Sequence, residues 1–475
     1  MKIFDGLRPI QTAEFLVMIL LAAAIPFYWF AAQCGEAGLL LCAVLKVVFD
    51  QKFHFNKEQL KFKWAYIIFA LTWVIYFIGM IYTDNQSEGW VQVTKKLGFL
   101  IFPVIFIFSD MSYITKDRFR AICYAFVAGC ILFFLMNLCY AFYDVIFNDA
   151  TRDRFFDRNL MKLYYVHHSY LSMYASLGLM FCFLEIFGET THKVKVLNVL
   201  VYIILAIFII LLASRAGLIC LVFLFVIQWM WLYFILKKKK LSLIIGCVLF
   251  FALVGTIKAF PNSFSKITET VENLTTERNS DKRLMQLKGY SQLLNDKWLF
   301  GVGTGDRSDE IFKSYYEYQD KFIDFLGRKN VRAINKIYET CYSCSVDSLR
   351  VLILENADKY GCDPDFLSEH FVDYLYIHHA VVRNLNAHNM YFETMISVGI
   401  IGLLLLLAYF IVPIVIWIKM RNFDILYFTF LFIIAFNALF ESVFEVQMGI
   451  IFFCFFNALL FKMNFIGVES TKNNE

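Results

Sequence analysis

Long apolar runs alternate with short polar turns over most of the chain. Many of these runs hold about 20 residues with few charges, the length that an α-helix needs to cross a membrane. The pattern predicts an all-α polytopic membrane protein with about twelve transmembrane helices. The predicted spans are 12–32, 36–50, 63–82, 94–109, 119–147, 165–187, 196–213, 216–236, 241–258, 389–418, 423–440 and 446–463.

One long polar segment, 258–387, separates the ninth predicted span from the tenth. It holds 17 Lys and Arg residues and 19 Asp and Glu residues, so its surface is solvated and nearly neutral. Apolar residues recur at helical spacing over 284–294 and 366–378, and Asp363 or Asp365 with Pro364 can begin the second helix. The sequence therefore predicts three parts: spans one to nine (1–257), a helical loop domain (258–387), and the last three spans with a tail (388–475).

Composition agrees with a membrane protein. Hydrophobic residues make up 60% of the chain and aromatic residues 19%, and the mean hydropathy is +0.60. The net charge of +4 is too small to indicate nucleic-acid binding. The first apolar run follows basic residues, as in a signal peptide, but it is long and continues into 28–30, which favours an uncleaved anchor.

Basic residues gather in every second connection between the predicted spans. Short cytoplasmic loops carry an excess of Lys and Arg, so the alternation predicts that both termini are cytoplasmic and that 258–387 lies outside. The basic residues of the inside loops are Lys52, Lys57, Lys61, Lys63, Lys116, Arg118, Arg120, Lys193, Lys195, Lys237 to Lys240, Lys419 and Arg421.

Two outside turns break this rule. One is 152–162, where Arg158 lies among other arginines, and the other holds Arg215 at the end of an apolar run. An arginine in hydrocarbon costs roughly 2.5–3.5 kcal/mol at a helix centre. Arg215 either extends its side chain to lipid phosphate or faces an anionic ligand, with Gly217 allowing close approach. Its planar guanidinium suits phosphate because it donates two parallel hydrogen bonds.

A second basic site follows in the loop, at Arg283. Some 17 residues later the chain reads Gly301-Val302-Gly303-Thr304-Gly305, in which alternating glycines permit a tight backbone around a phosphate or sugar. The spacing differs from the dinucleotide-binding fingerprint, and no alternation of strands and helices surrounds it. A charged residue at a helix start is otherwise an ordinary solvated face.

His388 is the candidate base. It is the last polar residue before the tenth predicted span, followed by Asn389 and Tyr391, and an imidazole can remove a proton from a sugar hydroxyl. The alternative is a structural histidine at a helix start. His168, in a His-His pair at the outer end of the sixth span, is either an interfacial hydrogen-bonding group or a neighbour of the sugar donor.

Metal chemistry has weaker support. Cys341 and Cys344 form a C-x-x-C, but only Cys362 accompanies them, and no second pair follows. Outside the membrane a disulfide among the three is favoured. The sequence predicts no metal site, no cofactor and a metal-independent reaction.

These motifs resemble the bacterial O-antigen ligase family, within the O-antigen ligase and polymerase superfamily. His388-Asn389, nine residues and Gly399 are similar to its H-[NSQ]-x9-G signature. Arg215 resembles its R-x3-L motif, with Ile219 in place of leucine. Arg283 with 299–303 is similar to an arginine before "P-L-x-G-x-G", with Trp298 in place of proline.

The resemblance implies a GT-C-like helical fold in the bacterial inner membrane and a role in lipopolysaccharide biosynthesis. An undecaprenyl-diphosphate-linked glycan would be the donor and a lipid A–core sugar the acceptor, at the periplasmic face. Arg215 and Arg283 would hold the diphosphate, and His388 would activate the acceptor with inversion at the anomeric carbon. Further substrate contacts are expected from Gly301, Gly303, Asn389, Tyr391, His168 and Arg158.

Three other functions stay open. A polymerase that joins two lipid-linked glycans is the closest, because the basic turn 152–162 offers a second diphosphate site. A protein O-oligosaccharyltransferase would use the same arginine and histidine chemistry. A secondary transporter agrees with the number of spans, but paired broken helices are not evident in the sequence.

Overall fold

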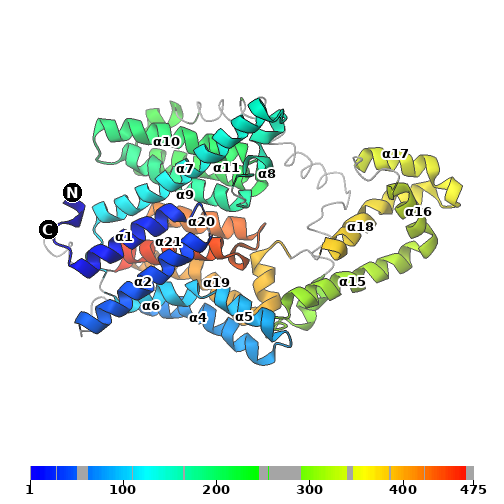
Figure 1. Ribbon diagram of the computed structural model, residues 1–475, viewed down its shortest axis with the longest axis horizontal. Helices are drawn as coiled ribbons and strands as arrows, with labels where there is room; N and C mark the ends of the chain where they lie inside the picture. Colours follow the sequence, from blue (N-terminus) through cyan, green and yellow to red (C-terminus); the bar gives the residue numbers. More distant parts are fainter. Residues whose placement is uncertain are drawn as a thin grey trace. The chain divides into compact units, whose positions relative to one another are not determined.

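The computed structural model describes residues 2–27, 29–50, 62–109, 111–163, 166–244, 246, 255, 290–339, 346–383, 387–421 and 423–466. Every regular element in these residues is a helix, as Figure 1 shows. Nine of the helices are long and apolar enough to cross a membrane, which confirms the prediction of an all-α polytopic membrane protein. The count of twelve stays a prediction, because most of 241–258 lies outside the described residues.

The chain forms two compact units. Unit 1 comprises Met1–Ile78, Val91–Ile267 and Leu404–Glu475, and unit 2 comprises Gly79–Trp90 and Thr268–Leu403. The predicted loop domain 258–387 lies mostly in unit 2, which also takes the turn 79–90 and the first part of the predicted tenth span. The three-part division predicted from the sequence is a division by chain order and stays a prediction.

Unit 1 is a bundle of helices, most of them apolar. They are α1 (Pro9–Ala24), α2 (Trp29–Asp50), α4 (Trp64–Ile78), α6 (Gly98–Phe108), α7 (Lys116–Phe147), α8 (Asp157–Leu160), α9 (His168–Phe187), α10 (His192–Leu211), α11 (Arg215–Met230), α20 (Ile425–Ala438) and α21 (Gln447–Phe465). Helices α5 (Gln86–Lys95) and α19 (Met390–Met420) each contribute residues to both units.

Helix α21 forms the core of unit 1. Almost every residue along it is buried, including a run of phenylalanines whose rings contact those of α6, α7 and α20. A helix that is apolar on all sides belongs in the interior of a bundle. In Figure 1, α21 accordingly runs through the middle of the bundle.

The predicted first span, 12–32, is wrong at its end. Helix α1 stops at Ala24, and Trp29 already begins α2. The cause is Pro26, which has no N–H group to continue a helix, and Phe27 N–H instead closes a turn onto the Ala24 carbonyl. Since the run is apolar on both sides of the proline, periodicity alone did not show the turn.

Unit 2 has helices and a core of its own. Helices α15 (Arg307–Leu326), α16 (Arg328–Glu339), α17 (Val346–Asn356) and α18 (Pro364–Arg383) bury a shared cluster that includes Ile334, Ile353 and Phe371. The helix predicted at 366–378 is confirmed within α18. Asp363 is its cap, because its carboxylate accepts the N–H groups of Asp365 and Phe366.

Candidate functional site

Helix α19 is interrupted near its start, and the glycine-rich loop packs on the interruption. Val398 and Gly399 depart from helical geometry. In a continuous helix the Ile400 N–H would donate to the Ile396 carbonyl; here it donates to the Trp298 carbonyl at 2.8 Å, and Val302 N–H donates to Ile396 at 2.8 Å. Two segments far apart in sequence thus exchange backbone hydrogen bonds.

Glycine is required on both sides of this contact. Gly399 has φ +69°, and a Cβ there would meet the Leu299 carbonyl oxygen at 2.1 Å. Gly301 has φ +76°, and a Cβ there would lie 2.6 Å from the Ser397 carbonyl. Gly303 N–H also donates to Ser397 O, at 3.0 Å. The close approach predicted for Gly301 and Gly303 therefore occurs with the backbone of α19, and a contact of these glycines with substrate stays a prediction.

We expect Gly399→Ala to destabilise the protein more than Gly327→Ala. Both glycines have positive φ, but a Cβ at Gly327 meets nothing within 4 Å. Gly327→Ala should cost only the left-handed backbone strain, about 1–2 kcal/mol, and Gly399→Ala should add about 1–3 kcal/mol from the clash. Unfolding in detergent measures both. Equal losses would show that the loop does not pack tightly on α19.

Asp306 joins the glycine-rich loop to the turn 79–90. Its two carboxylate oxygens accept the N–H groups of Asp84 and Asn85, at 2.8 and 2.7 Å. These amides precede α5, where a carboxylate is favoured by the unpaired N–H groups and the helix dipole. Asn85 also donates to Asp309 at 2.9 Å. The sequence did not indicate this structural role for Asp306.

The backbone on both sides of His388 is fixed. Ala387 N–H donates to the buried Glu393 carboxylate at 2.8 Å, and the Ala387 carbonyl accepts from the Tyr290 hydroxyl at 3.4 Å. Asn389 caps α19 by accepting the N–H group of Tyr391 at 3.0 Å. His388 itself is half-buried, with φ +47°. Non-glycine residues rarely adopt this conformation, and where they do the surroundings enforce it.

A buried ion pair supports the same turn. Arg307, at the start of α15, lies with its Nε 3.1 Å from an oxygen of Glu393, and the two side chains are 10% and 0% exposed. Glu393 therefore joins α15 to the residue before His388. Burial raises the pKa of the Tyr290 hydroxyl above its usual range, so this hydroxyl stays protonated and can donate.

The sequence did not indicate the roles of Arg307, Glu393 and Tyr290. One signal was present, since Glu393 is a lone carboxylate among apolar residues soon after His388. A charge in that position needs a buried partner. The sequence did not identify the partner, because Arg307 is distant along the chain.

In unit 1, α9, α11 and the turn after α20 meet in a second polar cluster. The Ser214 hydroxyl caps α11 by accepting Gly217 N–H at 3.4 Å. It lies 3.4 Å from the Ser169 hydroxyl, which donates to Glu441 at 3.0 Å. Half-buried Arg215 is the first residue of α11, and Ser214, just before it, contacts Ser169 of α9.

Gly217 serves helix packing in this cluster. A Cβ at Gly217 would lie 2.6 Å from Cβ of Ser172 in α9. The close approach inferred from the sequence is therefore an approach of two helices. A ligand beside Arg215 stays a prediction.

His168 begins α9 close to the basic turn. Its Nδ1 lies 3.6 Å from a carboxylate oxygen of Asp157, and its ring stacks on His167 at 4.3 Å. Arg158, next in sequence to Asp157, is exposed. Arg154 is buried with its Nε 2.6 Å from Asp144, so it holds the turn in place, whereas Arg158 is accessible to a ligand.

The sequence-predicted site residues divide between the two units. Unit 2 contains His388, Asn389, half-buried Tyr391, Gly301 and Gly303, and unit 1 contains Arg215, His168 and Arg158.

Arg283 lies outside the described residues, as do Cys341 and Cys344. Cys362 is a buried free thiol, and the predicted disulfide stays a prediction. Among the described residues, no three His, Cys, Asp or Glu side chains form a group that could hold a metal ion.

The fold and these clusters define a polytopic helical membrane protein with polar sites at helix ends. A family model described as O-antigen ligase matches residues 200–328. This stretch includes Arg215 and the glycine-rich loop, and the match supports membership of the chain in the O-antigen ligase family. No curated protein matches the chain.

The match to this family supports coarse functional statements. Proteins of this family are glycosyltransferase-like membrane enzymes. The family implies lipid-linked glycan and acceptor substrates in a membrane, and together with the apolar helices it indicates a multi-pass bacterial membrane protein. The matched stretch ends before His388.

Proposed function

We propose that the protein is a ligase that transfers a glycan from undecaprenyl diphosphate to a lipid A–core sugar at the periplasmic face of the inner membrane. The observation that carries the proposal is the fixed turn at His388. A half-buried imidazole, on a left-handed backbone held from both sides, is what a positioned base requires.

The reaction follows from the proposed roles. The His388 imidazole takes the proton of the acceptor hydroxyl as that oxygen attacks the anomeric carbon. The bond from this carbon to the diphosphate oxygen breaks with inversion, and the diphosphate leaves with the electron pair. Arg215 and Arg283 stabilise the leaving charge through charge-assisted hydrogen bonds, so the step needs neither a metal ion nor a cofactor.

The remaining predicted residues are assigned to binding in this proposal. Tyr391 and Asn389 flank the base, and their side chains can contact the acceptor sugar. His168 begins α9 and exposed Arg158 lies in α8, and both are assigned to the donor. Gly301 and Gly303 shape the backbone beside α19.

A polymerase is the second candidate, and one observation favours it. Arg158 is exposed, so it is open to a second diphosphate. Buried Arg154 is already bonded to Asp144, which reduces the basic surface of the turn. Purified protein incubated with lipid-linked glycan, with and without core-lipid acceptor, separates the two functions. A ligase forms product only with acceptor, and glycan lengthening on the carrier without acceptor would overturn the ligase proposal.

We expect Arg215→Ala to lower transfer by about 10- to 150-fold, the effect of one lost hydrogen bond to a charged group. Arg215→Lys should restore part of the rate, because the charge returns without the planar fork. Arg332→Ala, at an exposed position of α16, is the matched control and should leave the rate unchanged. A wild-type rate for Arg215→Ala would remove this residue from the mechanism.

A further inference from the structure

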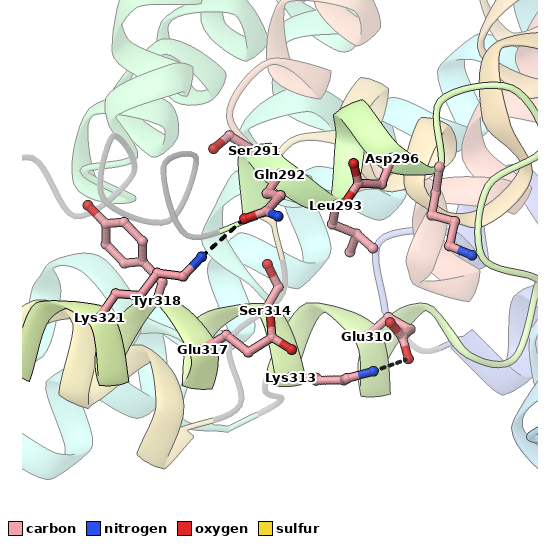
Figure 2. Close-up of a pocket in the computed structure, with 11 residues that line it drawn as sticks. Ser291, Gln292, Leu293, Asp296, Glu310, Lys313, Ser314, Glu317, Tyr318 and Lys321 are labelled. Carbon is pink, nitrogen blue, oxygen red and sulfur yellow. Dashed lines mark hydrogen bonds and ion pairs between the residues drawn. The ribbon is translucent and has the colours of Figure 1, made fainter.

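A polar groove runs along α15 in unit 2, and His388 is not among the residues that line it. One cavity, of about 380 Å³, lies between α15 and the short helix 290–296. Figure 2 shows side chains of both helices directed toward each other across it. A second cavity, of about 560 Å³, reaches Gly301 and Val302. The two share Lys297, Glu310 and Lys313, so they lie side by side along α15, and together they are called the groove below.

Helix α15 has two faces, and the groove occupies the polar one. Ile311 and Tyr315 are buried with Tyr290 and Ala387, beside the turn that carries His388. The opposite face presents polar side chains at helical spacing to the groove. They are Glu310, Lys313, Ser314, Glu317, Tyr318 and Lys321.

The lining has the chemistry of a saccharide site. Amide, carboxylate, ammonium and hydroxyl groups offer both donors and acceptors to sugar hydroxyls, and Tyr318 and Tyr82 offer aromatic faces. Two contacts in the lining are long and partly or fully exposed: Lys321 donates to Gln292 of the facing helix at 3.2 Å, and within α15 Lys313 lies 3.7 Å from Glu310. Such pairs contribute little stability, so a bound hydroxyl can replace them.

The net charge of the groove disfavours a phosphate ligand. Over the whole groove six carboxylates accompany three lysines, and one of the carboxylates, Asp306, is already bonded to two backbone amides. An excess of carboxylates disfavours a diphosphate or an acidic sugar and favours uncharged or amino-bearing sugars.

From this lining we propose that the groove is a saccharide subsite that binds uncharged or amino-bearing sugar units beyond the reacting one. Its assignment to the transfer reaction rests on the proposed function. Two sources offer this chemistry: the distal sugars of the donor glycan and the outer sugars of the acceptor. Kinetics with each substrate varied in turn distinguishes them.

The direct test is binding of the full-length protein in lipid nanodiscs to an array of bacterial oligosaccharides, grouped as uncharged, amino-bearing and acidic. Binding is expected in the first two groups. Glu317→Gln and Gln292→Ala should each weaken it about five- to tenfold, the effect of one hydrogen bond. The matched control is Glu369→Gln, the same change at an exposed position of α18 outside the lining.

The same variants in the transfer assay assign the source. A KM increase of about fivefold for only the donor, with kcat nearly unchanged, assigns the groove to donor sugars, and one for only the acceptor assigns it to acceptor sugars. His388→Ala should keep array binding while losing transfer, so the groove and the proposed function fail separately. Absence of array binding, binding confined to acidic glycans, or wild-type binding by both groove variants would overturn the groove assignment.

Discussion

His388→Ala is expected to lower glycan transfer by roughly 10²- to 10⁴-fold, the usual contribution of a positioned acid or base. The substitution removes the only group in the proposed mechanism that takes the acceptor proton. The hydrogen bonds on either side of His388, from Ala387 N–H to Glu393 and from Tyr391 N–H to Asn389, do not use the His388 side chain. The turn should therefore keep its shape. Initial rates with lipid-linked donor and core-lipid acceptor measure the loss.

His388→Gly makes this test sharper. Glycine adopts positive φ without strain, so this variant should keep the backbone conformation of the turn while lacking the base. Free imidazole added to it should recover part of the rate. His192→Ala, at an exposed position at the start of α10, is the histidine control. If the glycine variant transfers at the wild-type rate, His388 is not the base.

Arg307→Ala is expected to destabilise the protein by about 3–5 kcal/mol, because it leaves the Glu393 charge buried without the arginine. Glu393 is 0% exposed, and it also accepts the Ala387 N–H group. Transfer should therefore fall as well, through loss of the turn at His388. Equilibrium unfolding in detergent measures the stability, and the transfer assay measures the rate.

A double variant separates the two effects. Exchanging a buried ion pair for apolar residues of similar size is often nearly neutral for stability, so Arg307→Met with Glu393→Leu should recover part of the lost stability, less about 1–3 kcal/mol for the buried Ala387 N–H group that loses its acceptor. It lacks the acceptor for Ala387 N–H, so its transfer rate should stay low. A stable double variant with the wild-type rate would show that the pair only holds the fold together and does not position His388.

The sequence predicted the features that depend on local pattern. Apolar runs of spanning length gave the helices of unit 1, and the residues around Pro364 gave the start of α18 with its cap. His388 before an apolar run was found for the same reason, since a polar-to-apolar step marks a helix start. Arg215 was found because a charge at the end of an apolar run is costly.

Features that depend on distant contacts were not predicted. Nothing near Arg307 in the sequence identifies Glu393 as its partner. The basic turn also contains Arg154 and Arg158, which look equivalent in the sequence. The structure distinguishes them, because Arg154 is buried against Asp144 and supports the fold, whereas Arg158 is exposed.

The interruption of α19 has a consequence for biogenesis. Ile396 and Val398 are buried, and a backbone group left without a partner in apolar surroundings costs several kcal/mol. The backbone groups of this segment are paired by Trp298, which accepts from Ile400 N–H, and by Val302, which donates to the Ile396 carbonyl. Both residues leave the ribosome earlier than α19. The interrupted helix therefore takes backbone partners from a segment that has already been synthesised, and a chain that ends before Ile400 lacks the N–H group that donates to Trp298.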